Sequence, residues 1–343
     1  MINNPIYKNS LEKNVTEISI KDGNILVTGA TGLIGSCLID LLMIANRNGR
    51  SFNVYALGRN IEKLKDRFKA FTNSKHLHFI EQDIQNALNN KYIFDYIIHG
   101  ASNADPRKYL LYPVETMLIN MEGAKNVLNY CKIHQEVRAI MLSSFEVYGN
   151  ANKDYYYETD FGMINQNNIR SCYPESKRCM ELLTRCYVEE YGVKAIIGRL
   201  CSIYGPTMEK DDSKAHAQFI KNALRGENIV LKSRGDQKRT YCYVMDAVTG
   251  LLYALEKGKI GEVYNISNEK SIVSIAEVAE AVAIIAGTKV VYECPDEIEN
   301  KSFLCSQNCI LDNTKLKSLG WCGKYSLTQG LNESISILKY NNG

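Results

Sequence analysis

Short apolar runs alternate with longer stretches of helical periodicity in the N-terminal part of the chain, up to Leu200. The runs predict six strands, at Ile25–Thr28, Asn53–Leu57, Leu77–Glu81, Tyr96–His99, Ala139–Ser143 and Ala195–Leu200. Helices are predicted between them, near Leu33–Ile44, Ile61–Phe71, Val114–His134 and Glu175–Tyr191. Strands that alternate with helices predict an α/β fold with a doubly wound parallel sheet. Such a sheet binds ligands at the carboxyl ends of its strands.

The pattern loosens after Pro206, where polar loops dominate. One further strand and helix, Tyr241–Leu255, is expected to rejoin the sheet. The other C-terminal segments would then form a smaller α/β lobe that covers the cleft and binds the substrate. We therefore expect one domain from residues 1–199 plus 241–265 and a lobe from residues 200–240 plus 266–343. A short helix that lies on the first domain is expected within Met1–Lys21.

A glycine-rich turn, Gly29-Ala30-Thr31-Gly32-Leu33-Ile34-Gly35, directly follows the first predicted strand and opens the first predicted helix. Glycine lets the backbone turn tightly and approach a pyrophosphate, whose charge then lies at the amide-lined helix N-terminus. This context predicts a Rossmann-type dinucleotide site, although the spacing is G-x-x-G-x-x-G rather than G-x-G-x-x-G. The alternative is a strand-to-helix turn that needs glycine for its own geometry.

Charge and composition narrow the classes of partner. The net charge of +3 gives no reason to expect binding to nucleic acid or an anionic membrane. No apolar run approaches the ~20 residues needed to span a bilayer, and the polar N-terminus does not resemble a signal peptide. Eleven cysteines form an odd set without a C-x-x-C pair. We therefore expect free thiols, a cytoplasmic protein and no metal site.

A tyrosine and a lysine four residues apart, Tyr173 and Lys177, share one face if they are helical. A lysine ammonium can lower the pKa of a phenol, which then serves as a base near neutral pH. Tyr253 and Lys257 have the same spacing, but only Tyr173 follows a serine, Ser144, at the end of a candidate central strand. The Ser144 hydroxyl could bind the substrate oxygen that Tyr173 deprotonates.

With the glycine turn, Ser144, Tyr173 and Lys177 in this order, the chain resembles the extended short-chain dehydrogenases/reductases that modify nucleotide sugars. Further segments resemble family signatures: Asp83-Ile84, His99-Gly100-Ala101-Ser102, Asn120-x-x-Gly123, Val147-Tyr148-Gly149, Tyr204-Gly205-Pro206 and Arg239-Thr240-Tyr241. The resemblance implies that the cofactor is contacted by Gly29, Thr31, Gly32, Leu33, Ile34, Gly35, Asp83, Ile84, Ala101, Ser102, Asn120, Tyr173 and Lys177. It also implies that Arg239 grips the substrate pyrophosphate or sugar. Finally, it implies a homodimer built from the helices Val114–His134 and Glu175–Tyr191.

Within the family, several segments are similar to UDP-glucuronate decarboxylases. Ala101-Ser102-Asn103-Ala104-Asp105-Pro106-x-x-Tyr109 resembles their A-S-P-A-S-P-x-x-Y stretch, which implies substrate contacts for Asn103 and Tyr109. Arg170-Ser171-Cys172-Tyr173 resembles their R-x-C-Y, and Gly235–Arg239 resembles the loop that carries their substrate-binding arginine. Ser144-Phe145-Glu146 lies where decarboxylases and a subgroup of GDP-mannose dehydratases have T-S-E.

Glu146 lies two residues beyond Ser144. If that segment is extended, the carboxylate returns to the same face as the serine. We therefore expect Glu146 to carry proton chemistry at C5 of the sugar, or to orient the sugar, once C4 has been oxidised.

Three departures from the family pattern affect the prediction of the substrate and of the cofactor. Phe145 replaces a polar residue, and Ser202 stands where the family has a substrate-contacting asparagine. The second strand ends in Leu57-Gly58-Arg59-Asn60, without the aspartate that binds an NAD ribose. Arg59 could instead bind the 2′-phosphate of NADP, or it could be a solvated residue at the start of a helix. The cofactor is therefore NAD or NADP, held tightly because each cycle regenerates it.

The sequence thus predicts an enzyme that oxidises a nucleotide-diphosphate sugar at C4 and then decarboxylates, dehydrates or epimerises it. A UDP-glucuronate decarboxylase-like reaction is the best single expectation. The alternatives are a 4,6-dehydratase or 4-epimerase of a UDP-, GDP-, CDP- or dTDP-hexose, and an NADPH-dependent 4-keto-sugar reductase. An alternative of another class is a non-catalytic nucleotide-sugar-binding protein.

Overall fold

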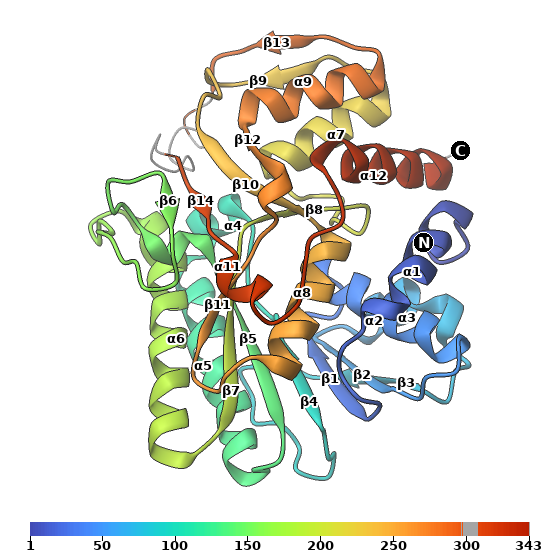
Figure 1. Cartoon of the computed structure of the whole chain (residues 1–343), viewed down its shortest axis with the longest axis vertical. Helices are drawn as coiled ribbons and strands as arrows, with labels where there is room; N and C mark the ends of the chain where they lie inside the picture. The colour runs from blue at the N-terminus through green and yellow to red at the C-terminus, as the bar shows by residue number, and fades with distance from the viewer. Residues whose placement is uncertain (296, 298–307, 343) are drawn as a thin grey trace.

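Seven parallel strands form the centre of the molecule, in the order β11-β7-β5-β4-β1-β2-β3 (Figure 1). The computed structural model describes residues 1–295, 297 and 308–342. All six predicted strands are confirmed as β1 (Asn24–Thr28), β2 (Asn53–Gly58), β3 (Leu77–Glu81), β4 (Tyr96–His99), β5 (Arg138–Ser144) and β7 (Lys194–Leu200). The strand order reverses between β1 and β4, whose last residues, Thr28 and His99, are paired. The crevice at such a switch point is where doubly wound sheets bind ligands.

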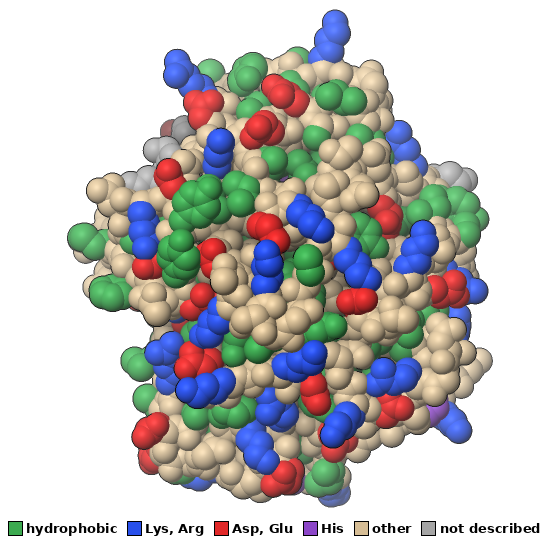
Figure 2. Space-filling view, in the orientation of Figure 1, with side chains coloured by type: hydrophobic (Ala, Val, Ile, Leu, Met, Phe, Trp, Pro, Cys, Tyr) green, Lys and Arg blue, Asp and Glu red, His purple; other side chains and the backbone are tan. Residues whose placement is uncertain are grey.

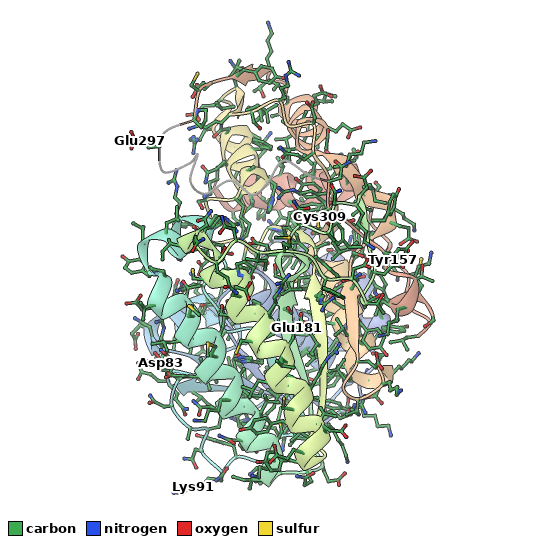
Figure 3. The ribbon with its side chains drawn as sticks, turned by 90° about the vertical axis from the view of Figure 1, so that its left-hand side faces the viewer. Asp83, Lys91, Tyr157, Glu181, Glu297 and Cys309 are labelled. Atoms are coloured by element: carbon green, nitrogen blue, oxygen red, sulfur yellow. The ribbon has the colours of Figure 1, made fainter. Side chains whose placement is uncertain are left out.

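Helices cover both faces of this sheet and give a three-layer α/β/α arrangement (Figure 1). On one face lie α2 (Leu33–Arg47), α3 (Ile61–Arg67) and α8 (Val244–Lys257). On the other lie α5 (Pro113–Ile133) and α6 (Cys172–Tyr191), which run side by side (Figure 3). Because both faces of the sheet are covered, the middle of each strand is mostly apolar, and most of the polar residues stand near the strand ends. The predicted Rossmann-type fold is therefore confirmed.

The expectation that the strand at Tyr241 rejoins the large sheet is wrong. That segment is β10 (Lys238–Tyr243), which belongs to a separate three-stranded sheet between β12 (Ile272–Ser274) and β8 (Ser202–Tyr204). The seventh strand of the large sheet is β11 (Val263–Ile266), which pairs in parallel with β7. Helix α8 leads into β11 and returns the chain to the sheet edge as a crossover helix does. The division into two domains remains a proposal.

The C-terminal lobe contains short strands and helices at the carboxyl end of the large sheet (Figure 1). Among the described residues, its helices include α7 (Ala215–Arg225), α9 (Ile275–Ala286) and α12 (Leu327–Asn342). Helix α11 (Thr314–Lys317) packs instead against β11 and α8. Strand β9 (Ile229–Leu231) pairs with β13 (Val290–Tyr292). Strand β14 (Ile310–Leu311) pairs with β6 (Tyr155–Tyr156) and so joins the lobe to the first part of the chain.

The predicted N-terminal helix is α1 (Pro5–Asn14), which packs between α2 and α12. The buried Tyr7 hydroxyl donates to the Asp40 carboxylate on α2 over 2.9 Å. The Asn4 amide donates to the Ile337 carbonyl on α12, also over 2.9 Å. The first residues therefore connect α2, which packs on the sheet, with α12 of the C-terminal lobe.

On the face drawn in Figure 2, basic and acidic side chains are interspersed. No helix within the described ranges is both long enough and apolar enough to cross a membrane. The cysteines described by the structure are all free thiols.

Candidate functional site

A single cleft of about 990 Å³ contains nearly all the residues that the sequence assigned to cofactor and substrate. It runs from the carboxyl ends of β1, β2 and β4 to the lobe residues of α7, β9 and β10. Its walls include Gly29, Thr31, Gly32, Leu33, Ile34, Gly35, Arg59, Asp83, Ile84, Ala101, Ser102, Asn103, Tyr109, Ser144, Glu146, Tyr173, Lys177, Ser202 and Arg239. Asn120 is the one assigned residue outside these walls. Tyr253 and Lys257 also lie outside them, on α8.

The three glycines of the first turn differ in whether the protein itself excludes a larger residue at their position. Gly29 has φ +70°, and a Cβ there would lie 2.6 Å from the Gly100 carbonyl oxygen. A Cβ on Gly35 would overlap the Gly29 carbonyl oxygen. Gly32, by contrast, has φ −74°, and a Cβ there would meet only the Gly29 oxygen, at an ordinary 3.4 Å. The protein itself therefore does not require glycine at position 32.

A ligand explains Gly32 better than the protein does. Gly32 is the N-cap of α2, lines the cleft, and leaves the first turn of the helix without a side-chain cap. Free amides at a helix N-terminus bind phosphate, and the missing Cβ lets a phosphate approach the backbone. The turn therefore fits the pyrophosphate of a dinucleotide.

Replacing Gly32 by alanine should weaken dinucleotide binding by about tenfold or more, equivalent to at least about 1.4 kcal/mol, with little change in thermal stability. The added methyl group would occupy ligand space and would not strain the protein. Gly35→Ala is the matched comparison and should lower the melting temperature, because its Cβ overlaps backbone. Calorimetric titration with NAD and thermal melting of both variants measure this difference. Unchanged NAD affinity in Gly32→Ala would contradict the assignment.

A threonine that the sequence analysis did not select, Thr28, orders the segment facing the glycine turn. Its hydroxyl oxygen accepts from the amides of Gly100 and Ala101, each over 3.1 Å. With its lone pairs so occupied, the hydroxyl donates to His99 Nδ1, 2.9 Å away. His99 is therefore neutral, and burial together with the Lys177 charge lowers its pKa to about 3. The sequence signal that could have identified Thr28 is a polar residue at the end of an apolar strand.

Asn120 braces the helices behind the cleft. Its amide donates to the Ser176 hydroxyl over 2.9 Å, and Ser176 donates to the Tyr173 carbonyl over 2.9 Å. Asn120 therefore joins α5 to the turn of α6 that carries Tyr173.

Tyr173 lies in the first turn of α6, buried at the inner end of the cleft. Burial and the Glu146 charge raise its pKa, while hydrogen bonding to Ser144 and Tyr109 and the Arg170 charge lower it. Lys177 is one turn further along, where its ammonium donates to the Leu142 carbonyl over 2.8 Å. Burial lowers the pKa of Lys177 to about 7. The described side chains therefore do not by themselves make Tyr173 acidic.

Tyr109 was expected to contact the substrate. It lies in the cleft wall, from α4 (Pro106–Leu111), with its ring stacked on that of Tyr173. The ring centroids are 4.3 Å apart and the planes differ by 8°.

The expectation that Glu146 lies on an extended segment is wrong. Phe145–Tyr148 forms a 3₁₀ turn, η3, in which the Ser144 hydroxyl accepts from the Glu146 amide over 3.2 Å. The Glu146 carboxylate still faces the cleft, where Arg170 binds both its oxygens, at 2.7 and 3.0 Å. The two side chains are 7% and 6% exposed. Arg170 belongs to the R-x-C-Y segment but was not assigned to the site.

The substrate side of the cleft is lined from the lobe. The Arg239 guanidinium lies 5.8 Å from the centroid of the Phe145 ring. Its Nε is buried and has no hydrogen-bond partner among the residues described. Ser202 pairs with Tyr241 across β8 and β10, and Tyr241 contacts the buried His216 edge to face. His216, on α7, also lines the cleft and was not found from sequence.

Arg59 is exposed and lines the opposite end of the cleft, just beyond β2. Lys63, on α3, lines the same end and forms an ion pair with Glu209 at 3.0 Å. Asp83 also lies there, and its carboxylate accepts from the Gln85 amide over 2.9 Å.

Comparison with known proteins agrees with this geometry. A sequence model of the NAD dependent epimerase/dehydratase family matches residues 25–267. UDP-glucuronic acid decarboxylase 6 of Arabidopsis thaliana is 34% identical over 311 residues, which cover 90% of this chain and 86% of the relative. The structure of UDP-glucose 4-epimerase from Thermotoga maritima with UDP-glucose aligns with a TM-score of 0.78 and 26% identity, covering 93% of this chain and 100% of that chain.

The UDP-glucuronic acid 4-epimerase of Bacillus cereus, solved with UDP-glucuronic acid and NAD, has the same fold. It aligns with a TM-score of 0.77 at 24% identity and covers 93% of this chain and 99% of that chain.

Proposed function

Since the chain belongs to the NAD-dependent epimerase/dehydratase family, we propose that it oxidises the hexuronate of a nucleotide-diphosphate sugar at C4 and then decarboxylates it. UDP-glucuronate is the substrate we favour. The similarity to UDP-glucuronic acid decarboxylases along 90% of the chain supports this choice.

The observation that carries the proposal is the ion pair between Glu146 and Arg170. Arg170 engages both oxygens of the Glu146 carboxylate, so the carboxylate is directed toward the guanidinium rather than toward a proton on C5 of a bound sugar. Phe145 supplies no acid or base beside it. Dehydration and epimerisation at C5 need a base for the C5 proton. Decarboxylation needs none, because the departing CO₂ leaves its bonding electrons on C5. The pair therefore favours decarboxylation over dehydration. A 4-epimerase also needs no base at C5, and the similarity to UDP-glucuronic acid decarboxylases is what favours decarboxylation over that reaction.

Arg239 would bind a negatively charged group of the substrate. Its buried Nε is unpaired within the described part of the chain, and a guanidinium beside the Phe145 ring lies at the inner part of the cleft. A planar guanidinium matches the geometry of carboxylate and phosphate oxygens. A hexuronate offers both, through its C6 carboxylate and its pyrophosphate.

Each step then uses a named side chain. Tyr173 removes the proton of the C4 hydroxyl, while Ser144 donates a hydrogen bond to the same oxygen. The glycine turn from Gly29 to Gly35 would hold NAD, and the bound nicotinamide would supply the acceptor and later the donor of the C4 hydride. The C4 ketone makes the C5 carboxylate a β-keto acid, and loss of CO₂ leaves an enolate on C4 and C5. Glu146 positions the sugar while a solvent water molecule donates a proton to C5. Tyr173 then returns its proton to the C4 oxygen as hydride comes back to C4.

The test is to incubate the purified protein with NAD and a panel of UDP-, GDP-, CDP- and dTDP-sugars and to weigh the products. Release of CO₂ from UDP-glucuronate, with the matching loss of mass, is the expected result. Loss of water would show a dehydratase, and an isomer of unchanged mass would show an epimerase. No turnover, with tight binding of a nucleotide sugar, would show a binding protein.

The Arg59→Ala variant tests whether the cofactor is NAD or NADP. If its guanidinium binds a 2′-phosphate, Arg59→Ala should weaken NADP binding by about 1.5–3 kcal/mol, as for a charged hydrogen bond, and leave NAD binding unchanged. Calorimetric titration with both nucleotides measures this, with Arg47→Ala on α2 as a control outside the cleft. Tight NADP binding would favour the NADPH-dependent 4-keto-sugar reductase. Equal effects on both nucleotides, or none, would leave NAD as the cofactor.

The outer faces of α5 and α6 support the proposed homodimer (Figure 3). They expose apolar side chains, including Leu182 at 65% and Leu118 at 39%. Two copies of this helix pair would bury them in an isologous four-helix contact. We expect Leu118→Glu/Leu182→Glu to be a monomer by light scattering at micromolar concentration, while the wild type is a dimer. Ile284→Glu, at an exposed position on α9, should leave the dimer intact; a monomeric wild type would refute the assembly.

A further inference from the structure

Arg170 contacts the two groups on which the proposed reaction depends. It lies in the turn η4 (Ile169–Ser171), where its backbone amide donates a hydrogen bond to the Asn168 side chain. Helix α6 begins directly after this turn. Its guanidinium binds both oxygens of Glu146, and it lies 5.5 Å from the centroid of the Tyr109 ring. That ring is stacked on Tyr173. One cation therefore touches the Glu146 carboxylate and the outer ring of the Tyr109–Tyr173 stack.

We propose that Arg170 is a positioning residue that holds Glu146 and the Tyr109–Tyr173 stack in one rigid unit and offsets the Glu146 charge beside Tyr173. The inference rests on the roles proposed above for Glu146 and Tyr173. It assigns no contact between Arg170 and the substrate.

Stability alone gives a weak reason for this buried ion pair. Removing two charges from water costs about as much as their attraction returns, so such a pair adds little net stability. The Glu146–Arg170 pair nevertheless faces the cleft with almost no solvent exposure. Charges buried at the wall of a functional cleft are typical of sites where they act on a neighbouring group.

That neighbouring group is the Tyr173 phenol. A carboxylate beside it opposes ionisation, since the Glu146 charge raises the pKa of Tyr173 and of Tyr109. The Arg170 charge lowers the pKa of both phenols. The guanidinium therefore lets the Glu146 carboxylate lie close to a phenol that must lose its proton.

Other ionisable groups surround this cluster and remain in place when Arg170 is replaced. They are Asp105 at the start of α4, Cys172 and Lys177 on α6, Cys309 before β14, and Arg239 on β10. Arg170 is the cation bound directly to Glu146 in the described chain. Its removal should leave a buried carboxylate without this compensation.

The test compares Arg170→Met and Arg170→Lys with Arg178→Met. Arg178 is a matched control, a partly buried arginine on α6 that binds the carbonyls of Val147 and Gly162 rather than Glu146. In Arg170→Met the acid limb of the kcat profile should move to higher pH by about 1–3 units, because the Tyr173 phenol loses the Arg170 charge that lowers its pKa. At neutral pH, kcat should fall by about 10–100-fold while KM changes little. Arg170→Lys should restore part of both effects.

A second measurement needs no substrate, so it separates this inference from the proposed reaction. Trifluorotyrosine, whose phenol is more acidic than tyrosine, is incorporated at position 173 and titrated by ¹⁹F NMR in the free protein. Its midpoint should rise in Arg170→Met and stay unchanged in Arg178→Met. Equal midpoints and an unshifted acid limb in Arg170→Met would overturn the proposal and leave Arg170 a structural residue. A shifted midpoint with an unexpected product from the wild type would retain the inference and reject decarboxylation.

Discussion

Replacing Tyr173 by phenylalanine should lower turnover by about 10²–10⁴-fold, the usual loss when a general base is removed. The change removes one oxygen from a buried side chain and keeps the ring that stacks on Tyr109. Nucleotide-sugar and NAD binding should therefore be nearly unchanged. Steady-state kinetics and calorimetric titration of the same preparation measure the two effects separately.

The pH dependence gives a second signature of Tyr173. Burial and the Glu146 charge raise its pKa, so the reactive phenolate is lost as the pH falls. We expect the kcat/KM of the wild type to rise with pH on its acid side and the residual activity of Tyr173→Phe to lack this limb. Tyr253→Phe, in the other tyrosine–lysine pair, lies outside the cleft on α8 and should be nearly silent. A Tyr173→Phe enzyme with more than about a tenth of the wild-type rate would contradict the assignment of Tyr173 as the general base.

Glu146→Gln should slow the part of the reaction that follows the first hydride transfer. The amide keeps the size of the side chain but removes the charge that Arg170 binds, so the oxidised sugar would no longer be held for the second half-reaction. C4 oxidation depends on Tyr173 and Ser144 and should still occur. Loss of a hydrogen bond between charged groups predicts a fall in kcat of about 10–100-fold.

The trapped state can be observed directly. Protein-bound nicotinamide should accumulate in its reduced form, which absorbs in the near ultraviolet, together with a 4-keto sugar that can be identified by mass after quenching. Glu158→Gln is a suitable control, because this half-buried carboxylate accepts from the Asn265 amide outside the cleft. If Glu146→Gln turns over at the wild-type rate, Glu146 is a structural acid, and the argument for decarboxylation from its ion pair fails.

Local sequence was sufficient for six strands of the large sheet with their helices and for the order of the chemistry along the chain. It did not predict the short elements of the lobe or the 3₁₀ turn at Phe145–Tyr148. Strands buried on both faces must be apolar, and helices packed on a sheet must repeat with helical periodicity, so β1 to β5, β7 and their helices could be read directly. The glycine turn was recognised for the same reason, because backbone approach to a phosphate restricts which residues can stand there. Tyr173 was separated from Tyr253 by its order after Ser144.

The tertiary structure decided every relation between side chains from separate segments. The sequence did not place the Tyr241 strand correctly, because the residues of a short strand do not specify its neighbour. In the structure, β11 occupies the sheet edge beside β7. Asn120 lies behind the cleft because the packing of α5 on α6 sets its direction. Glu146 and Arg170, 24 residues apart, meet because a 3₁₀ turn after β5 and another before α6 direct both side chains into one cleft. Periodicity records which face of an element is buried, whereas the partner of a buried charge depends on the whole fold.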